Sequence, residues 1–258
     1  MIWRFRRRYA SKRRRAYVAT LLRAARWGLY LLLLLILLDA FYVALLRPDW
    51  SRLAQGPIPK SRFIKEYQNA QRQDRALPPL HWRPVSLSNI PRVLRQAVII
   101  AEDSRFYEHE GFDLIAFKEA MDYNLTRGRF VLGASTISQQ TTKNLLLSSS
   151  RNPLRKWHEL ILTWDMERHL SKKRILEIYL NIAEFGPGIY GVEAATRTYW
   201  QKSASALTWS EAAELAATLP SPKQHNPATR TERFNQRVQK IMGFIERFEL
   251  DQSTVRAY

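Results

Sequence analysis

The chain has 258 residues, of which 46% are hydrophobic and 25% are charged, with a net charge of +18 and no cysteine. This length allows a short N-terminal appendage and one domain of about 200 residues with a full hydrophobic core. The lack of cysteine excludes disulfides and cysteine-ligated metals. The charge alone would suit either nucleic acid or an anionic membrane.

The positive charge is concentrated at the N-terminus. Residues 1–26 hold ten Lys or Arg and no acid, and removing these ten charges from +18 leaves +8 for the other 232 residues. Residues 27–46 then form a largely apolar run, and twenty helical residues span about 30 Å, the thickness of a bilayer core. A signal peptide has a shorter apolar stretch and a small-residue cleavage site. We therefore expect a basic cytoplasmic tail (1–26) and one transmembrane anchor (27–46), oriented by the positive-inside rule.

The anchor has one unfavourable residue and one rival interpretation. Asp39 is costly at mid-membrane and is tolerable only near the outer interface or facing a partner. The rival is a buried core helix behind a nucleic-acid-binding tail. Nothing downstream resembles a groove-reading motif, so we expect no nucleic acid partner.

Residues 47–90 contain six prolines, which predicts a stalk with little regular structure that leads into the domain. Residues 91–258 are predicted to form a mainly α domain, because apolar residues recur at three- and four-residue steps and strand-like alternation is scarce. The expected helices start at Pro91 as first helical residue, at Asn152-Pro153 (to about residue 170), after Ser171 (172–181), at Ser210-Glu211 (ending before Pro220), and at about 231 (to 248).

The first candidate site lies at the end of the helix that follows Pro91. Glu102 is expected at the edge of the buried face, where a fixed and poorly hydrated carboxylate suits a general base. Asp103 adjoins it, and Phe106, His109 and Gly111 follow in a compact turn. The alternative is an exposed acidic pair at a helix end, with the histidine supporting the loop.

Three further polar blocks follow in the chain. If Ser135 caps a helix, then Thr136, Gln140 and Lys143 share one face that could bind a diphosphate or a sugar, although a solvated polar helix is the alternative. Arg155 and Glu159 lie four residues apart and alone would be an ordinary ion pair worth about 0.3–0.5 kcal/mol. Residues 172–191 contain Glu177 and Asn181, interpreted as structural, and glycines that predict a tight, exposed turn near the site.

In this order the blocks resemble the peptidoglycan glycosyltransferase family, also called transglycosylases. The matching patterns are Glu-Asp-x-x-Phe-x-x-His-x-Gly, Gly-Ala-Ser-Thr-Ile-x-Gln-Gln-x-x-Lys-Asn, Arg-Lys-x-x-Glu and Ile-Leu-Glu-x-Tyr-Leu-Asn-x-x-x-Phe-Gly, followed by a fifth block, Gly-Val-Glu-Ala-Ala, at residue 191. The resemblance covers roughly residues 85–225. Two departures are Ala134, where many members have glycine, and Trp200-Gln201, which replaces a frequent Phe-Gly before Lys202.

The resemblance implies a lysozyme-like helical fold that polymerises lipid II with inversion at the anomeric carbon and release of undecaprenyl diphosphate. It implies that Glu102 is the base acting on the acceptor 4-hydroxyl, and that Lys143 and Arg155 hold the diphosphate. Glu159 would be the second carboxylate, assisting departure or binding a divalent cation there (Mg²⁺ or Mn²⁺), and no other metal or cofactor is expected. Residues implied to shape the donor and acceptor sites are Asp103, Phe106, His109, Ser135, Thr136 and Gln140.

The resemblance also implies partners and a location. The expected partners are lipid II, the lipid-linked glycan chain, the membrane and cell-wall synthesis proteins. The expected location is the bacterial inner membrane, with a single span and a periplasmic catalytic domain. Bifunctional relatives add a C-terminal transpeptidase domain, and about 36 residues follow Pro222, so we expect the monofunctional branch. Two alternatives are a lysozyme-like hydrolase, for which a diphosphate clamp would be unnecessary, and a non-catalytic scaffold.

Overall fold

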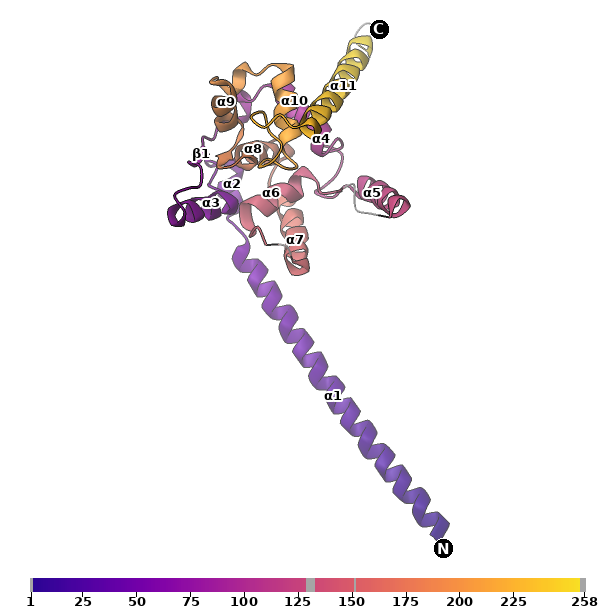
Figure 1. Ribbon diagram of the computed structural model, residues 1–258. Coiled ribbons are helices and arrows are strands. Elements are labelled where there is room, and N and C mark those ends of the chain that lie inside the picture. Colours follow the sequence, from indigo (N-terminus) through magenta and orange to yellow (C-terminus); the bar gives the residue numbers. More distant parts are fainter. Residues whose placement is uncertain (1, 129–132, 151, 256–258) are drawn as a thin grey trace. The chain divides into compact units, whose positions relative to one another are not determined.

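The computed structural model describes residues 2–128, 133–150 and 152–255 (Figure 1). The chain forms two compact units, Met1–Pro48 and Asp49–Tyr258. The first unit holds a single helix, α1 (Ile2–Leu46). It contains a stretch that is long and apolar enough to cross a membrane, by length and composition. The predicted N-terminal apolar helix is therefore confirmed, and its side chains at residues 31–38 are exposed.

The second unit is mainly α, as predicted. Its helices are α2 (Trp50–Gln55), α3 (Arg62–Gln73), α4 (Arg92–Glu102), α5 (Leu114–Arg127), α6 (Ile137–Leu146), α7 (Pro153–His169), α8 (Lys172–Ile182), α9 (Val192–Trp200), α10 (Trp209–Thr218) and α11 (Glu232–Val255), with short 3-10 turns η1 (Leu87–Asn89) and η2 (Ala204–Ala206). A small sheet has the order β1-β3-β2, in which β1 (His81–Trp82) pairs parallel and β2 (Glu184–Gly186) antiparallel with β3 (Ile189–Tyr190).

Two predicted helix starts are confirmed and one is displaced by a residue. The Asn152 side chain accepts a hydrogen bond from the Arg155 N–H at the start of α7, and Pro153 is its first residue. Ser171 caps α8 in the same way. Pro91 is the N-cap of α4 and not its first helical residue, because its ψ of 152° is extended.

Capping boxes explain two further corrections. The cap of α6 is Thr136 and not Ser135, since the Thr136 hydroxyl accepts from the Gln139 N–H while the Gln139 side chain accepts from the Thr136 N–H. Thr208 and Glu211 form the same arrangement, so α10 begins at Trp209, one residue before the predicted start.

The expectation of little regular structure in residues 47–90 was wrong. The side chains of Asp49 and Ser61 cap α2 and α3 immediately after proline-containing turns. Both helices contribute to the core of the unit, and the buried Trp50 donates through Nε1 to Asp165 Oδ2 at 2.7 Å. The prolines lie outside these two helices and do not prevent the helices from forming.

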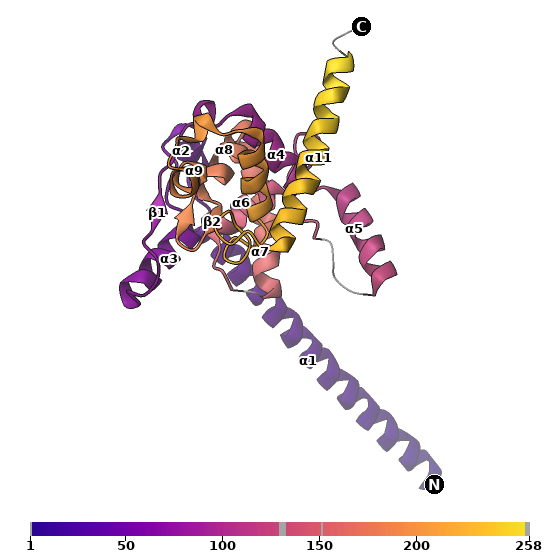
Figure 2. The same cartoon turned by 45° about the horizontal axis from the view of Figure 1, so that its top comes forward.

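The core of the second unit places the end of α4 among several helices. α6 packs against α7 and α8, while α10 packs against α4 and α11. Figures 1 and 2 show α4, α10 and α11 side by side in both views. Because α8 buries seven of its eleven residues, the helices around it are held in a fixed arrangement.

α5 differs from the other α-helices of the second unit because it buries only Ala120 among its residues. Asp113 caps its start, and Gly128 ends it in the left-handed conformation with a φ of 61°. Both figures show α5 standing away from the rest of the second unit. Its exposed large apolar residues are Leu114, Ile115, Phe117, Met121, Tyr123 and Leu125.

Glu184 in β2 is a largely buried carboxylate. Its Oε1 has no hydrogen-bond partner within the described part of the chain, and the nearest cation is Lys223 Nζ at 3.9 Å. Burial raises the pKa of Glu184 from 4.5 to about 7, and the Lys223 charge opposes this rise. The folded protein thus holds this proton more tightly than the unfolded chain does.

We expect Glu184→Gln to stabilise the protein at pH 8 but not at pH 4.5. The stability that the raised pKa provides is complete below pH 4.5 and is lost as the pH rises through about 7. The gain in free energy of unfolding at pH 8 should be on the order of 1–3 kcal/mol. Thermal unfolding in detergent at both pH values measures it, with the exposed Glu246→Gln as control. An equal change at both pH values would contradict the explanation.

Candidate active site

Glu102 lies at the C-terminal end of α4, and its carboxylate is held on both sides. Oε1 accepts a hydrogen bond from Arg237 Nη2 of α11 at 2.9 Å, and Oε2 accepts one from Gln140 Nε2 of α6 at 2.9 Å. The Glu102 side chain is only 10% exposed. The arrangement gives the fixed position that a general base requires.

The chemistry of Glu102 follows from its neighbours. Burial raises its pKa above the ordinary value, while the Gln140 hydrogen bond and the charges of Arg237 and Lys143 oppose the rise. The fully buried Tyr179 donates its hydroxyl proton to Gln140 Oε1 at 3.1 Å. This bond fixes the amide orientation, so that the Gln140 nitrogen faces Glu102.

Asp103 joins the turn after α4 to the start of α6. Its Oδ1 accepts from His109 Nε2 at 2.9 Å, and its Oδ2 accepts from the Ile137 N–H at 2.9 Å. A carboxylate at a helix N-terminus is favoured by the helix dipole. Phe106 is fully buried beneath this turn, with its ring 6.4 Å from that of His109. The predicted acidic loop therefore forms one packed unit, with the histidine as its support.

The same turn contains three residues whose ligand atoms lie within 4.8 Å of one another and could hold a metal ion, Asp103, His109 and Asp113. Both oxygens of Asp103 are already engaged, one of them by His109. Asp113 Oδ1 accepts from two backbone N–H groups at the start of α5. A metal ion bound here would have to replace the hydrogen bond between Asp103 Oδ1 and His109 Nε2.

The cations of the second and third blocks gather around Glu159. Glu159 is 2% exposed and accepts from Arg155 Nη1 at 2.9 Å and from Lys156 Nζ. Arg155 Nε is buried with no hydrogen-bond partner in the described residues. Burial lowers the pKa of Lys143; the Glu159 charge opposes this, and Arg155 and Lys156 reinforce it. The ion pair of Arg155 and Glu159 forms as predicted, within a larger cationic cluster.

Two neighbouring cavities adjoin these groups. A polar cavity of about 190 Å³ is lined by Glu102, Asp103, Ser135 and Thr136, among others. A second cavity, of about 920 Å³, shares Asp113, Ala134 and Ser135 with the first. It is bordered by the apolar side chains Phe112, Leu114, Phe117, Leu160, Ile161 and Trp164.

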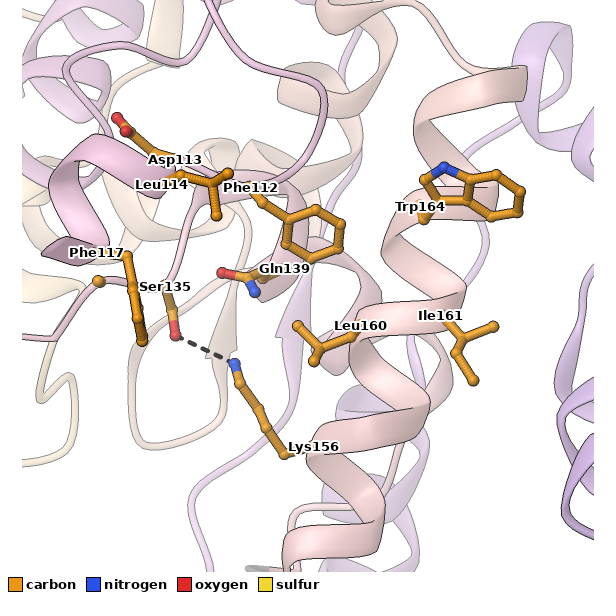
Figure 3. Close-up of a pocket in the computed structure, with 11 residues that line it drawn as sticks. Phe112, Asp113, Leu114, Phe117, Ser135, Gln139, Lys156, Leu160, Ile161 and Trp164 are labelled. Atoms are coloured by element: carbon orange, nitrogen blue, oxygen red, sulfur yellow. Dashed lines mark hydrogen bonds between the residues drawn. The ribbon is translucent and has the colours of Figure 1, made fainter. Parts of the chain in front are cut away.

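Figure 3 shows how the large cavity combines apolar and polar groups. Leu160, from α7, and Phe112, ahead of α5, point toward its interior. Lys156 Nζ reaches Ser135 Oγ at 3.4 Å across one edge. A molecule with an apolar chain and an anionic head is the kind of ligand that such a cavity would accept.

Glu177 and Asn181 of the fourth block make structural contacts. Glu177 Oε1 accepts from the Leu87 N–H at 2.8 Å, and the Asn181 side chain exchanges two hydrogen bonds with the backbone of Val85. The prediction of an exposed glycine turn was wrong in its exposure, because Gly186 and Gly188 are both buried.

Gln201 is one of the two residues that replace the frequent Phe-Gly pair of the resemblance. It ends α9 in the left-handed conformation, with a φ of 53°. Glycine adopts this conformation without strain, which accounts for its frequency at such a position.

The sequence analysis did not assign Lys156, Tyr179 or Arg237 to the site. Both Lys156 and Tyr179 stand inside the recognised blocks, Lys156 next to Arg155 and Tyr179 two residues before Asn181, and this was the available signal. Arg237 lies 135 residues after Glu102, in a helix that no motif marks. Only the packing of α11 on α4 brings it to the carboxylate.

Comparisons with known proteins identify the family. The sequence profile of the transglycosylase family matches residues 71–245. The chain is similar to the biosynthetic peptidoglycan transglycosylase of Methylobacillus flagellatus, with 42% identity over 199 residues, which cover 77% of this chain and 86% of that protein. The protein of that description from Haemophilus influenzae Rd is 51% identical over 169 residues, covering 64% and 68% of the two chains. The chain therefore belongs to the peptidoglycan transglycosylase family and is a glycosyltransferase with a mainly α, lysozyme-like fold.

Proposed function

We propose that the protein polymerises lipid II into glycan strands, with Glu102 as general base. The observation that carries this proposal is the pairing of two cavities that share a wall. The Glu102 carboxylate borders the polar cavity. Apolar side chains border the larger cavity, and Lys156 adds a positive charge to its lining. Lipid II has the same division, since its sugars are polar, its diphosphate is anionic and its polyprenyl chain is apolar.

In the proposed step, Glu102 takes the proton of the acceptor sugar's 4-hydroxyl. The freed oxygen attacks the anomeric carbon of the lipid-linked chain from the face opposite the diphosphate. The bond between that carbon and the diphosphate oxygen breaks, and its electron pair leaves with undecaprenyl diphosphate. The new glycosidic bond therefore has inverted configuration at the anomeric carbon.

The leaving group is proposed to be stabilised by Lys143, Arg155 and Lys156. Cations placed where negative charge develops can replace a strong acid in such a departure. The buried Arg155 Nε, which has no protein partner among the described residues, would be satisfied by a diphosphate oxygen. Glu159 holds Arg155 and Lys156 in place. Titration of Mg²⁺ and Mn²⁺ after chelation tests whether a divalent cation accompanies the diphosphate.

The polyprenyl chain is proposed to occupy the apolar cavity at the membrane surface. The exposed apolar residues of α5, together with Trp157 and Trp164 of α7, border or adjoin this region. Trp and other large apolar side chains favour the membrane interface. With α1 as a single-span anchor and the basic tail in the cytoplasm, the catalytic unit would work on the periplasmic face of the inner membrane.

Leu160→Ser should weaken the use of full-length lipid II without affecting an analogue with a short lipid chain. Loss of one buried leucine contact lowers affinity by about tenfold. Initial rates over a range of substrate concentrations give the KM for each substrate. Leu154→Ser, on the same helix but outside the cavity lining, is the matched control. An equal loss of affinity for both substrates would mean that the lipid chain binds outside this cavity.

The direct test of the proposed function incubates the purified full-length protein with lipid II in detergent. We expect long glycan strands, one undecaprenyl diphosphate for each bond formed, and digestion of the strands by a β-1,4-specific muramidase. A hydrolase would instead release fragments from preformed glycan. A scaffold would produce neither result.

A further inference from the structure

Arg237 lies on the side of α11 that packs toward α4 and α10. The buried residues of α11 recur at the spacing of one helical face: Phe234, Val238, Ile241 and Ile245. Arg237 directly precedes Val238 and is intermediate in exposure, whereas Arg233, one turn earlier, is exposed. The apolar face of α11 thus fixes where the Arg237 guanidinium can reach.

One nitrogen of Arg237 makes two contacts at the end of α4. Nη2 donates to Glu102 Oε1 at 2.9 Å and to the backbone carbonyl of Ala101 at 3.3 Å. The last carbonyls of a helix carry partial negative charge, which also favours a cation here. Arg237 therefore binds the helix end as well as the carboxylate, and the two contacts together define the direction of the Glu102 side chain.

We propose that Arg237 is a positioning residue for the general base, holding the Glu102 carboxylate ionised and directed toward the polar cavity through a contact from outside the motif blocks. This inference rests on the proposed role of Glu102. With Gln140 on Oε2 and Arg237 on Oε1, the plane of the carboxylate is fixed. Each oxygen retains a further lone pair that can accept the substrate proton.

The charged groups around Glu102 show how Arg237 affects the pKa of this carboxylate. Burial raises the Glu102 pKa, and the opposing groups are Gln140 and Lys143 from α6 and Arg237 from α11. Two further titratable groups nearby are Asp103 and the buried Tyr179 of α8. The buried acid of α10, Glu214, is paired with Arg230 at 3.1 Å. Removing Arg237 should therefore raise the pKa of Glu102 further.

The test compares Arg237→Gln, Arg237→Lys and the exposed control Arg233→Gln with the wild-type full-length enzyme. For Arg237→Gln we expect kcat at pH 7 to fall about 10- to 100-fold, the effect of losing one charge-assisted hydrogen bond. KM should change little, and the acid limb of the pH–rate profile should move to higher pH. Arg237→Lys should return the limb toward its wild-type position, and Arg233→Gln should match the wild type.

Two results would overturn the inference. One is an unchanged acid limb in Arg237→Gln with normal kcat. The other is a rise in KM alone, which would mean that Arg237 binds substrate directly. Melting temperatures show whether each variant folds, and if Arg237→Gln does not fold, Arg237→Met, which also removes the charge, takes its place in the same comparison.

Glu102→Gln separates this inference from the proposed function. If Glu102→Gln keeps near-normal activity, the assignment of the base fails. If it is inactive while Arg237→Gln behaves as wild type, only the role of Arg237 fails. The double variant Glu102→Gln/Arg237→Gln should be no slower than Glu102→Gln, because a residue that acts only through Glu102 has nothing left to position. A further loss in the double variant would contradict the inference.

Discussion

Replacing Glu102 with glutamine is expected to lower the rate of glycan polymerisation by about 10²–10⁴-fold, the usual contribution of a positioned base. Glutamine keeps the size of the side chain and leaves an oxygen for Arg237, but it cannot take the proton of the acceptor hydroxyl. Initial rates of lipid II consumption measure the effect. Glu246→Gln, which changes an exposed acid of α11 in the same way, should retain the wild-type rate.

The pH dependence of the wild-type rate is a second test of Glu102. Burial raises the pKa of Glu102 above the ordinary range of glutamate, so the rate should fall with decreasing pH at a higher pH than an exposed glutamate would give. A near-normal rate in a folded Glu102→Gln protein would remove Glu102 from the mechanism.

Replacing Lys143 with alanine should reduce the use of the donor by about 10²–10³-fold, as expected when one preorganised electrostatic stabiliser is lost. The charge of Lys143 interacts with the carboxylates of both Glu102 and Glu159. Two lipid II analogues separate the substrate roles. One lacks the 4-hydroxyl and can only donate, and the other lacks the diphosphate and can only accept.

The clamp role predicts a larger loss of affinity for the donor-only analogue, titrated against a saturating acceptor-only analogue, than for the acceptor-only analogue in the reverse titration. Lys143→Arg should recover part of the donor activity because it keeps the positive charge. Lys173→Ala, which removes an exposed lysine of α8, should have little effect. Equal losses with both analogues would argue against a diphosphate contact and for a general structural role.

Local chemistry was enough to predict several elements and some of the contacts in the candidate site. Asn152 and Ser171 mark the starts of α7 and α8, because side-chain caps act within one turn of the chain. Glu102 was placed at the end of α4 by apolar periodicity, and Arg155 was placed beside Glu159 by helical spacing. These predictions depend on contacts between residues that are close in sequence.

The remaining features depend on long-range packing. Arg237 reaches Glu102 only because α11 packs on α4, and Tyr179 orients Gln140 only because α8 packs on α6. α5 could not be predicted from a buried stripe, since it buries only Ala120. Sequence patterns pointed to the proposed reacting groups, whereas the groups that contact and orient them emerged from the tertiary structure.

The most direct test of the central claim is the size distribution of products from wild-type and Glu102→Gln protein incubated side by side with lipid II in detergent. We predict long glycan strands from the wild type and almost none from Glu102→Gln at equal folded concentration. Strands of equal yield and length from both proteins would contradict the assignment of the base. Fragments released from preformed glycan, with no strands made, would contradict the proposed polymerisation itself.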